Sequence, residues 1–364
     1  MNALEARIRE IIATSGPLTI GQYMAMCLGD PEHGYYMQRP PFGAEGDFTT
    51  APEISQIFGE LIGLWAADYW QRMGAPDPVI LAEFGPGRGT LMQDALRAAH
   101  ALPAFREAAR PWLIETSPRL RAVQQQALAG EKVQWGQSLA DLPPGPMIAI
   151  ANEFFDALPV RQFIRLADGW HERLVGIQGD HLVFITSPRA DQNIPELLAE
   201  AHLSAAEGEI AEICPDAQRI AAEIAARLQR QDGAMLFLDY GPARSATGDS
   251  LQALRDHRFH DPLADPGEAD ITAHVDFQRL LESARLRGGR TAGPLTQGEF
   301  LSRLGLHQRA GVLAHQNPAR QKEIMEGAKR LSAPGEMGTL FKAAAIFRQD
   351  GPVPAGFTEA ECLP

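Results

Sequence analysis

Apolar and polar positions at the amino end of the chain alternate with the period of an α-helix. Leu4, Ile8 and Ile12 fall on one helical face, which predicts a helix that ends before the Gly-Pro pair at residues 16–17. Thr19 is a suitable residue to open a second short apolar helix. The chain therefore begins with a predicted helical segment.

A longer helical pattern follows between residues 54 and 72. Thr50 and Glu53 have the spacing of a capping box, and Pro52 falls in the first turn, so one long helix is predicted to follow Thr50. Apolar side chains then recur every three or four positions until Gly74, and the simplest interpretation is that these side chains form part of the hydrophobic core.

From Pro78 the pattern changes to short apolar runs separated by helical segments. This alternation is typical of an α/β fold with a doubly wound parallel sheet. The predicted strands are VILAEFG, WLIETS, VQW, MIAIANEF and AMLFLDYG, and the predicted crossover helices include residues 90–101 and 118–129.

Two later stretches depart from this rhythm. Residues 160–190 read as a β-meander with Gly-containing turns, inserted into the α/β pattern. Residues 195–230 read as helical and return the chain to the strand AMLFLDYG, and residues 337–347 read as a final edge strand. The expected divisions are 1–77 (helical segment and cofactor lid), 78–159 (first part of the cofactor domain), 160–230 (inserted substrate cover), 231–348 (remainder of that domain) and 349–364 (tail).

Composition excludes several classes of protein. The 364 residues carry 33 Lys and Arg against 46 Asp and Glu, a net charge of −13, which opposes tight binding to nucleic acid. Cys27, Cys214 and Cys362 are far apart and form no CxxC pair, so neither a disulfide framework nor a structural zinc site is expected. No signal peptide or membrane-spanning run is recognisable, and we expect a cytoplasmic location.

The glycine-rich segment at residues 83–89 carries the first candidate chemistry. It follows a predicted strand and opens a predicted helix, and its glycines allow a sharp turn close to a ligand. The spacing is GxGxG, and Thr90 stands where a dinucleotide-binding GxGxxG loop would have its third glycine. Glu83 would repel phosphates but could orient water or an ammonium group, so S-adenosylmethionine is the predicted cofactor. The loop residues in this prediction are Glu83, Gly85, Gly87 and Gly89.

Two further strand ends are predicted to contact the same cofactor. Glu115 ends the second strand, where a carboxylate can accept both ribose hydroxyls; the alternative is a helix-start acid favoured by the macrodipole. After the third strand, Ser138 and Leu139 mark the turn where adenine would be contacted, and no acid was expected in that turn.

The fourth strand ends in the polar cluster Asn152, Glu153 and Asp156. An amide and two acids at the carboxyl edge of a parallel sheet stand where the reactive end of a ligand should lie. Methyl transfer is an in-line displacement that mainly requires alignment of the nucleophile. If that nucleophile is a guanidinium, Glu153 and Asp156 could hold it bidentately. The alternative roles are a turn acid for Glu153 and a helix-capping acid for Asp156.

At these residues the chain resembles the MidA-like class I S-adenosylmethionine-dependent methyltransferases, which include the mitochondrial complex I assembly-factor methyltransferase. The resemblance implies a Rossmann-like, seven-stranded methyltransferase sheet with added helices and an insertion that covers the substrate. In the mitochondrial relative it also implies methylation of an arginine on a complex I subunit. The motifs that carry it are GDFTTAPEISQIFGE, EFGPGRGTLMQDALRA, IETSPRLR, ANEFFDALPVRQF, FLDYG, HRFHDPLADPGEADITAHVDF, PLTQGEFLSRLGL and EMGTLFKAAA.

The resemblance also draws attention to polar residues outside the sheet. It implies a lid at residues 47–50, with Asp47 on the substrate side and Thr50 reaching the cofactor, against the alternative of a simple helix cap. It implies substrate contacts from His257, Asp270 and His274. Tyr240 ends the fifth strand and could line the acceptor pocket or merely pack there. A metal site at Asp270 and His274 would require a helix in this segment, so no metal is expected.

Several functions remain open at the level of sequence. The first is a methyltransferase that acts on an arginine of a protein; the resemblance suggests a complex I subunit as the target, and a homodimer is one state that the sequence leaves open. The alternatives are an assembly chaperone that binds the cofactor without essential catalysis, a small-molecule methyltransferase, and a nicotinamide-dependent oxidoreductase, against which Thr90 counts.

Overall fold

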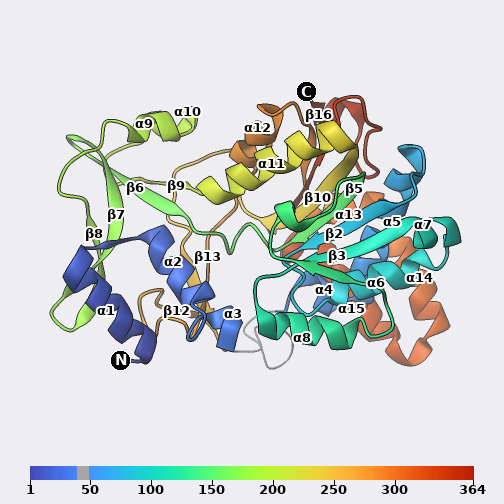
Figure 1. Ribbon diagram of the computed structural model, residues 1–364, viewed down its shortest axis with the longest axis horizontal. Coiled ribbons are helices and arrows are strands. Elements are labelled where there is room, and N and C mark those ends of the chain that lie inside the picture. The colour runs from blue at the N-terminus through green and yellow to red at the C-terminus, as the bar shows by residue number, and fades with distance from the viewer. Residues whose placement is uncertain (39–48) are drawn as a thin grey trace. The chain divides into compact units, whose positions relative to one another are not determined.

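The computed structural model describes residues 1–38 and 49–364, which form two compact units (Figure 1). Unit 1 contains residues 1–48, 155–219 and 244–279, and unit 2 contains residues 49–154, 220–243 and 280–364. Both units are assembled from separated stretches of chain. The expected divisions differ from these units, because residues 1–48 and 244–279 fall with the inserted meander.

Unit 2 is built on an eight-stranded sheet. The central pairs β2–β3, β2–β5, β3–β4 and β5–β10 are parallel, and β15 pairs antiparallel with β10 and with β14. The doubly wound parallel sheet is therefore confirmed, with the two-residue strand β16 added at one edge. In spatial order the strands are β16 (Cys362–Leu363), β14 (Arg290–Thr296), β15 (Phe341–Phe347), β10 (Gly233–Tyr240), β5 (Met147–Asn152), β2 (Val79–Phe84), β3 (Ala109–Ile114) and β4 (Gln134–Gly136).

Helices cover both faces of this sheet because its central strands are apolar on both sides. On one face, alternate strand residues such as Ile150 and Leu236 share a core with α5 (Gln56–Arg72) and α6 (Thr90–Ala99). On the other, α11 (Pro215–Gln231) and α12 (Phe277–Arg285) approach β15 around Gly289. The remaining helices of unit 2 are α4 (Ala51–Ile54), α7 (Pro103–Ala108), α8 (Pro118–Ala127), α13 (Gln297–Arg303), α14 (Leu306–Gln316), α15 (Gln321–Ser332) and α16 (Met337–Leu340).

Unit 1 holds the predicted β-meander. Strands β6 (Arg161–Leu166), β7 (Gly169–Gln178) and β8 (His181–Thr186) pair antiparallel, and β1 (Leu18–Thr19) and β9 (Ile210–Ile213) complete a five-stranded sheet. A second, three-stranded sheet has the order β12 (Arg258–His260), β11 (Gln252–Arg255) and β13 (Asp270–Thr272). The helices of unit 1 are α1 (Ala3–Ser15), α2 (Ile20–Gly29), α3 (Tyr35–Gln38), α9 (Ile194–Leu197) and α10 (Glu200–Leu203).

The two amino-terminal helices form as predicted. Leu4 and Ile8 of α1 are buried in one cluster with Tyr23 of α2 and Val175 of β7. A capping box between Thr19 and Gln22 opens α2, which identifies the first residue of that helix.

The predicted capping box at Thr50 and Glu53 is wrong. The Thr50 side chain caps nothing, and the Glu53 carboxylate accepts a hydrogen bond from the Thr90 hydroxyl at 2.6 Å. The long helix is present as α5, but it starts at Gln56 and is separate from α4. Ser55 adopts extended backbone angles after α4, and its hydroxyl caps the start of α5.

Two other expectations need correction. The strand over residues 341–347 is not an edge strand, because β15 lies between β10 and β14. Residues 195–230 are not wholly helical, because β9 pairs with β6 there. In both cases the pairing strand, β14 or β6, comes from a distant part of the chain, so the local pattern of apolar residues cannot predict the pairing.

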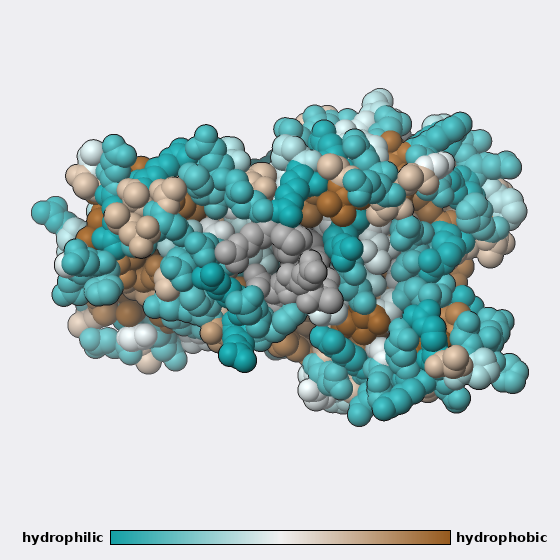
Figure 2. Space-filling view, turned by 90° about the horizontal axis from the view of Figure 1, so that it is seen from below, coloured by the Kyte–Doolittle hydropathy of each residue, from teal (hydrophilic) through white to brown (hydrophobic). Residues whose placement is uncertain are grey.

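Charged and polar groups dominate the surface shown in Figure 2, where apolar residues form only small separated areas. Within the described residues, no helix combines the length and the apolar character needed to cross a bilayer. Cys27, Cys214 and Cys362 are all free thiols.

Candidate functional site

The glycine loop follows β2 and leads into α6, as predicted. Gly85, Gly87 and Gly89 all have positive φ angles, of 63°, 52° and 84°. A Cβ atom added to Gly85 would lie 2.9 Å from Cδ2 of Phe154. Glycine is therefore required at position 85 both by the backbone conformation and by the close approach of an aromatic ring.

Strand register aligns the predicted cofactor residues of unit 2 at one edge of the sheet. Phe84 is paired with Ile114 on one side and with Ala151 on the other. The residues that follow these three are Gly85, Glu115 and Asn152, so they lie next to one another at the carboxyl ends of β2, β3 and β5. Ligands of open α/β sheets bind at this edge.

Glu83 and Asn152 present buried oxygens near the loop. Glu83 is 3% exposed, and its Oε2 has no hydrogen-bond partner among the residues that the structure describes. Burial raises the pKa of Glu83 to about 8, although a backbone hydrogen bond from Met92 opposes the shift. The buried Oδ1 of Asn152 likewise lacks a partner within the described part of the chain. A ligand with an ammonium group or other donors would satisfy such oxygens.

Glu115 is buried and held by two donors. Its Oε1 accepts from the backbone N–H of Ser117 at 2.7 Å, and its Oε2 accepts from the Gln124 amide at 3.0 Å. Burial raises the pKa of Glu115, and the hydrogen bonds from Ser117 and Gln124 oppose that rise. Sequence reasoning missed Gln124. It could have been identified as the one polar residue on the apolar face of α8 between Leu120 and Leu128.

Glu53 was also missed as a residue that supports the loop. Besides the hydrogen bond from Thr90, its carboxylate lies 3.7 Å from the guanidinium of Arg88. Thr90 and Arg88 both lie where the glycine loop leads into α6. The Glu53 side chain therefore connects α4 to this segment. Thr50, the predicted cofactor contact, is half-buried at the start of α4.

Glu153 occupies a constrained position at the end of β5. Its φ angle is +50°, a conformation that costs a residue other than glycine about 1–2 kcal/mol. Its backbone N–H donates to the carbonyl of Leu238, and its Oε1 accepts from the backbone N–H of Ala51 at 3.2 Å and from Nδ2 of Asn152 at 3.1 Å. The carboxylate therefore binds the first turn of α4, which matches the turn-acid alternative and leaves its catalytic role a prediction.

Residues 136–139 contain no acid, but the nearby Asp141 binds this turn. The Asp141 carboxylate accepts from the backbone N–H groups of Gln137 and Ser138, and these bonds lower the pKa of Asp141. Ser138 itself is exposed and Leu139 half-buried. Asp141 was not identified from the sequence because it lies three residues beyond Ser138, and only the folded turn brings its carboxylate to the Ser138 N–H.

In unit 1 the structure brings Asp156 and Asp270 near one tyrosine. The Tyr36 hydroxyl donates to Oδ1 of Asp270 at 2.9 Å. Burial raises the pKa of Tyr36, and the charges of Asp270 and Asp156 raise it further. Both aspartates are almost fully buried, at 6% and 4% exposure, and the Asp156 carbonyl accepts from the N–H of Ala273. Tyr36 was not identified from the sequence because a lone tyrosine in a turn-rich segment has no distinguishing pattern.

The other predicted substrate residues are dispersed. His274 is half-buried, and its N–H donates to the Ser250 hydroxyl at 2.8 Å. His257 is exposed at the β11–β12 turn, whereas Asp270 is buried on β13. Tyr240 of unit 2 is buried against Phe341, with ring centroids 5.3 Å apart. Asp47 lies outside the described residues.

Asp270 belongs to a strand, so Asp270 and His274 do not share a helical face. Over residues 1–38 and 49–364, no group of three or more His, Cys, Asp and Glu side chains is placed to hold a metal ion.

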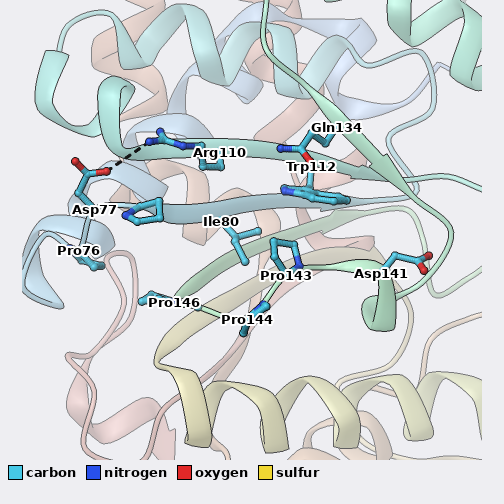
Figure 3. A pocket seen from close by; sticks show the side chains of 12 residues that line it. Pro76, Asp77, Ile80, Arg110, Trp112, Gln134, Asp141, Pro143, Pro144 and Pro146 are labelled. Carbon is cyan, nitrogen blue, oxygen red and sulfur yellow. Dashed lines mark ion pairs between the residues drawn. The ribbon is translucent and has the colours of Figure 1, made fainter.

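A groove of about 750 Å³ lies elsewhere on unit 2 (Figure 3). It is lined by Ile80 and Trp112 of neighbouring strands and by the prolines that precede β5. The connection from β4 to β5 contains only the 3₁₀ turn Leu139–Asp141, so no helix covers the sheet here. The groove lies toward the amino ends of β2 and β5, and none of the predicted site residues lines it.

Comparison with known proteins now identifies the family. Residues 61–295 match the family model described as "Putative S-adenosyl-L-methionine-dependent methyltransferase". The chain belongs to this family. It is 37% identical to the Drosophila melanogaster "Protein arginine methyltransferase NDUFAF7 homolog, mitochondrial", over 95% of this chain and 85% of that protein. It is 36% identical to the Homo sapiens "Protein arginine methyltransferase NDUFAF7, mitochondrial", over 92% of this chain and 81% of that protein.

A solved structure agrees with this assignment. A Burkholderia thailandensis protein crystallised with S-adenosyl-homocysteine is 28% identical, with a TM-score of 0.85 over 98% of this chain and 96% of that chain. The predicted family, the α/β methyltransferase fold and the cofactor are thus confirmed, and the oxidoreductase alternative is wrong. This chain is an S-adenosylmethionine-dependent methyltransferase.

The residues of unit 2 fit that cofactor. The positive φ angles of the loop leave its backbone accessible, and the unpartnered oxygens of Glu83 and Asn152 suit the ammonium group of the methionine part. Glu115 suits the ribose hydroxyls because a carboxylate only accepts hydrogen bonds. When bound, the cofactor supplies an electrophilic methyl group on a sulfonium. The unpartnered oxygens of Glu83 and Asn152 would orient this donor through its ammonium group.

Proposed function

We propose that this chain transfers the methyl group to a guanidinium nitrogen of an arginine in a protein. The main support for the proposal is that relatives named as protein arginine methyltransferases are 36–37% identical to this chain over at least 92% of its length. The buried carboxylates of Asp156 and Asp270 in unit 1 agree with it, because carboxylates are the usual partners of a guanidinium.

The chemistry requires help with one proton. The arginine nitrogen attacks the methyl carbon, the carbon–sulfur bond breaks, and its electron pair stays on sulfur to give S-adenosylhomocysteine. The attacking nitrogen then loses a proton, which a carboxylate or solvent can accept. Asp156 and Asp270 are the proposed acceptor-binding acids, and Tyr36 orients Asp270 through its hydrogen bond. Glu153 and Asn152 are proposed to shape the turn at the end of β5.

Proteome-wide mass spectrometry of methylarginine, with and without this gene, tests the proposal. We expect one or a few arginine peptides to lose their methylation when the gene is deleted. Reintroduced Asp156→Asn and Asp270→Asn variants should fail to restore it, although both should still bind S-adenosylhomocysteine in calorimetry. The exposed turn residue Asp180 offers a matched control, since Asp180→Asn should restore the modification fully.

Other outcomes would point to the alternatives. An unchanged methylarginine proteome, with a methylated metabolite lost instead, would favour a small-molecule substrate and contradict the proposal. A deletion phenotype rescued by variants without methyl transfer would favour the chaperone. A complex I subunit as target, a homodimer and a cytoplasmic location stay predictions, and the names of the relatives place those proteins in mitochondria.

A further inference from the structure

Gln124 is a buried polar residue on the apolar face of α8. It has no exposed surface, and it stands between Leu120 and Leu128, which are 5% and 3% exposed. At these positions, four residues apart on one helical face, a leucine would be the ordinary choice. A buried amide is unfavourable unless all its hydrogen-bonding groups are satisfied.

All three polar contacts of Gln124 are directed and distinct. Its Nε2 donates to the carbonyl of Gly87 at 2.8 Å and to Oε2 of Glu115 at 3.0 Å. Its Oε1 accepts from the indole N–H of Trp135 at 3.0 Å. Two acceptors on one side and a donor-only indole on the other allow one orientation of the amide, and neither Glu nor Leu can reproduce it.

These contacts join the two parts of the cofactor site that come from different strands. Gly87 is the central glycine of the loop after β2, and Glu115 follows β3. The Glu115 carboxylate is also fixed from its other oxygen by the N–H of Ser117, which begins α8. Gln124 therefore sets the rotation of the carboxylate and the position of the loop carbonyl together.

We propose that Gln124 is a positioning residue for donor binding, which holds Glu115 in the orientation that accepts the ribose hydroxyls of S-adenosylmethionine. Gln124 acts through Glu115 and the loop, and it donates both amide hydrogens inward to them. The inference concerns the donor alone, so it is independent of the methyl acceptor.

The test measures ribose recognition and needs no activity. The dissociation constants of S-adenosylhomocysteine and its 2′-deoxyribose analogue are measured by calorimetry for each variant. A lost hydrogen bond to a charged group corresponds to roughly ten- to a hundredfold in affinity, so the wild type should prefer the ribose ligand by about tenfold or more. Glu115→Gln should reduce this preference strongly.

Gln124→Met keeps the length and the helical preference of the side chain but removes its donors. We expect the preference for the ribose ligand to fall to within about threefold, as in Glu115→Gln, because the carboxylate is no longer held. Gln125 is exposed on the same helix, so Gln125→Met is the matched control and should keep the wild-type preference. If Gln124→Met does not fold, Gln124→Asn withdraws the amide by one carbon and should show the same loss.

Three results would overturn the proposal. The preference of the Gln124 variants could equal that of the wild type. Both ligands could weaken equally, which would mean that Gln124 supports only the fold of the loop. Glu115→Gln could keep full ribose discrimination, in which case Glu115 is not the residue that Gln124 positions for the ribose.

Discussion

At the scale of single residues, the proposed donor site contains polar groups whose burial is unfavourable in the free protein. Glu83 is the clearest case, since it is 3% exposed and keeps one oxygen without a partner in the described structure. Asn152 and Gln124 are buried as well, yet Gln124 has all its contacts satisfied. A preorganised binding site requires acceptors that are free to bind the ligand, held in place by neighbouring side chains whose own hydrogen bonds are complete.

Glu83 should make the stability of the free protein depend on pH. Its pKa is about 8 in the folded chain against a usual value of 4.5, so the folded state binds more protons than the unfolded state between these values. The contribution of this proton to the free energy of unfolding is therefore complete below about pH 4.5. It is lost as the pH rises toward 8, and the loss is a few kcal/mol and at most on the order of 5 kcal/mol. Glu83→Gln removes this titration. Urea unfolding at about pH 5.5 and about pH 8 should show a smaller loss for the variant than for the wild type, and parallel losses would contradict the assignment.

At the scale of elements, short contacts between helices and loops complete the site. The four-residue helix α4 cannot be stable by itself, and its contacts with its surroundings fix it: Glu153 binds the Ala51 N–H, and Glu53 binds Thr90. Neither contact is visible in the helical pattern around residue 50. The capping-box spacing of Thr50 and Glu53 was misleading because the Glu53 carboxylate accepts from the Thr90 hydroxyl.

The contact between Glu53 and Thr90 should support donor binding. Glu53→Met removes the acceptor and Thr90→Val removes the donor of the 2.6 Å hydrogen bond, and we expect each to weaken S-adenosylhomocysteine binding by about five- to tenfold. Because both remove the same interaction, the double variant should be little weaker than either single one. Glu107 is exposed on α7, and Glu107→Met serves as the control. Additive effects in calorimetry would show that the two side chains act separately.

The sequence predicted the elements that have a strong local pattern. Five parallel strands were recognisable as apolar runs, and β2, β5 and β10 are buried along their whole length. Strand β14 was missed because Gly293 and Pro294 interrupt it where its register with β15 shifts. The strands of the three-stranded sheet have only three or four residues, too few for a period to be detected. Glu83, Glu115 and Asn152 could be proposed from sequence because they lie at or just beyond the carboxyl ends of predicted strands. Tyr36 and Gln124 could not, because their contacts are with residues distant in sequence.

At the scale of the whole molecule, both units are discontinuous in sequence. Residues 155–219 and 244–279 leave and rejoin the sheet-bearing unit 2. A change of period in the sequence can mark such an insertion, as it did for the meander, but it cannot show that residues 1–38 fold with it. That grouping rests on packing of α1 and α2 against β7, which joins positions more than 150 residues apart.

Donor binding should stabilise the folded chain as a whole, because the loop and Glu115 are assembled only in the native state. S-adenosylhomocysteine at about one hundred times its dissociation constant should raise the free energy of unfolding by about 2.7 kcal/mol, seen as a rise in Tm of several degrees. NADH should cause no shift. Gly85→Ala should abolish the response, because its Cβ would lie 2.9 Å from Phe154 at a φ of +63°. Gly130 has a similar φ with no atom near its Cβ, so Gly130→Ala should lower Tm slightly and keep the response, and a full response in Gly85→Ala would contradict the assigned loop.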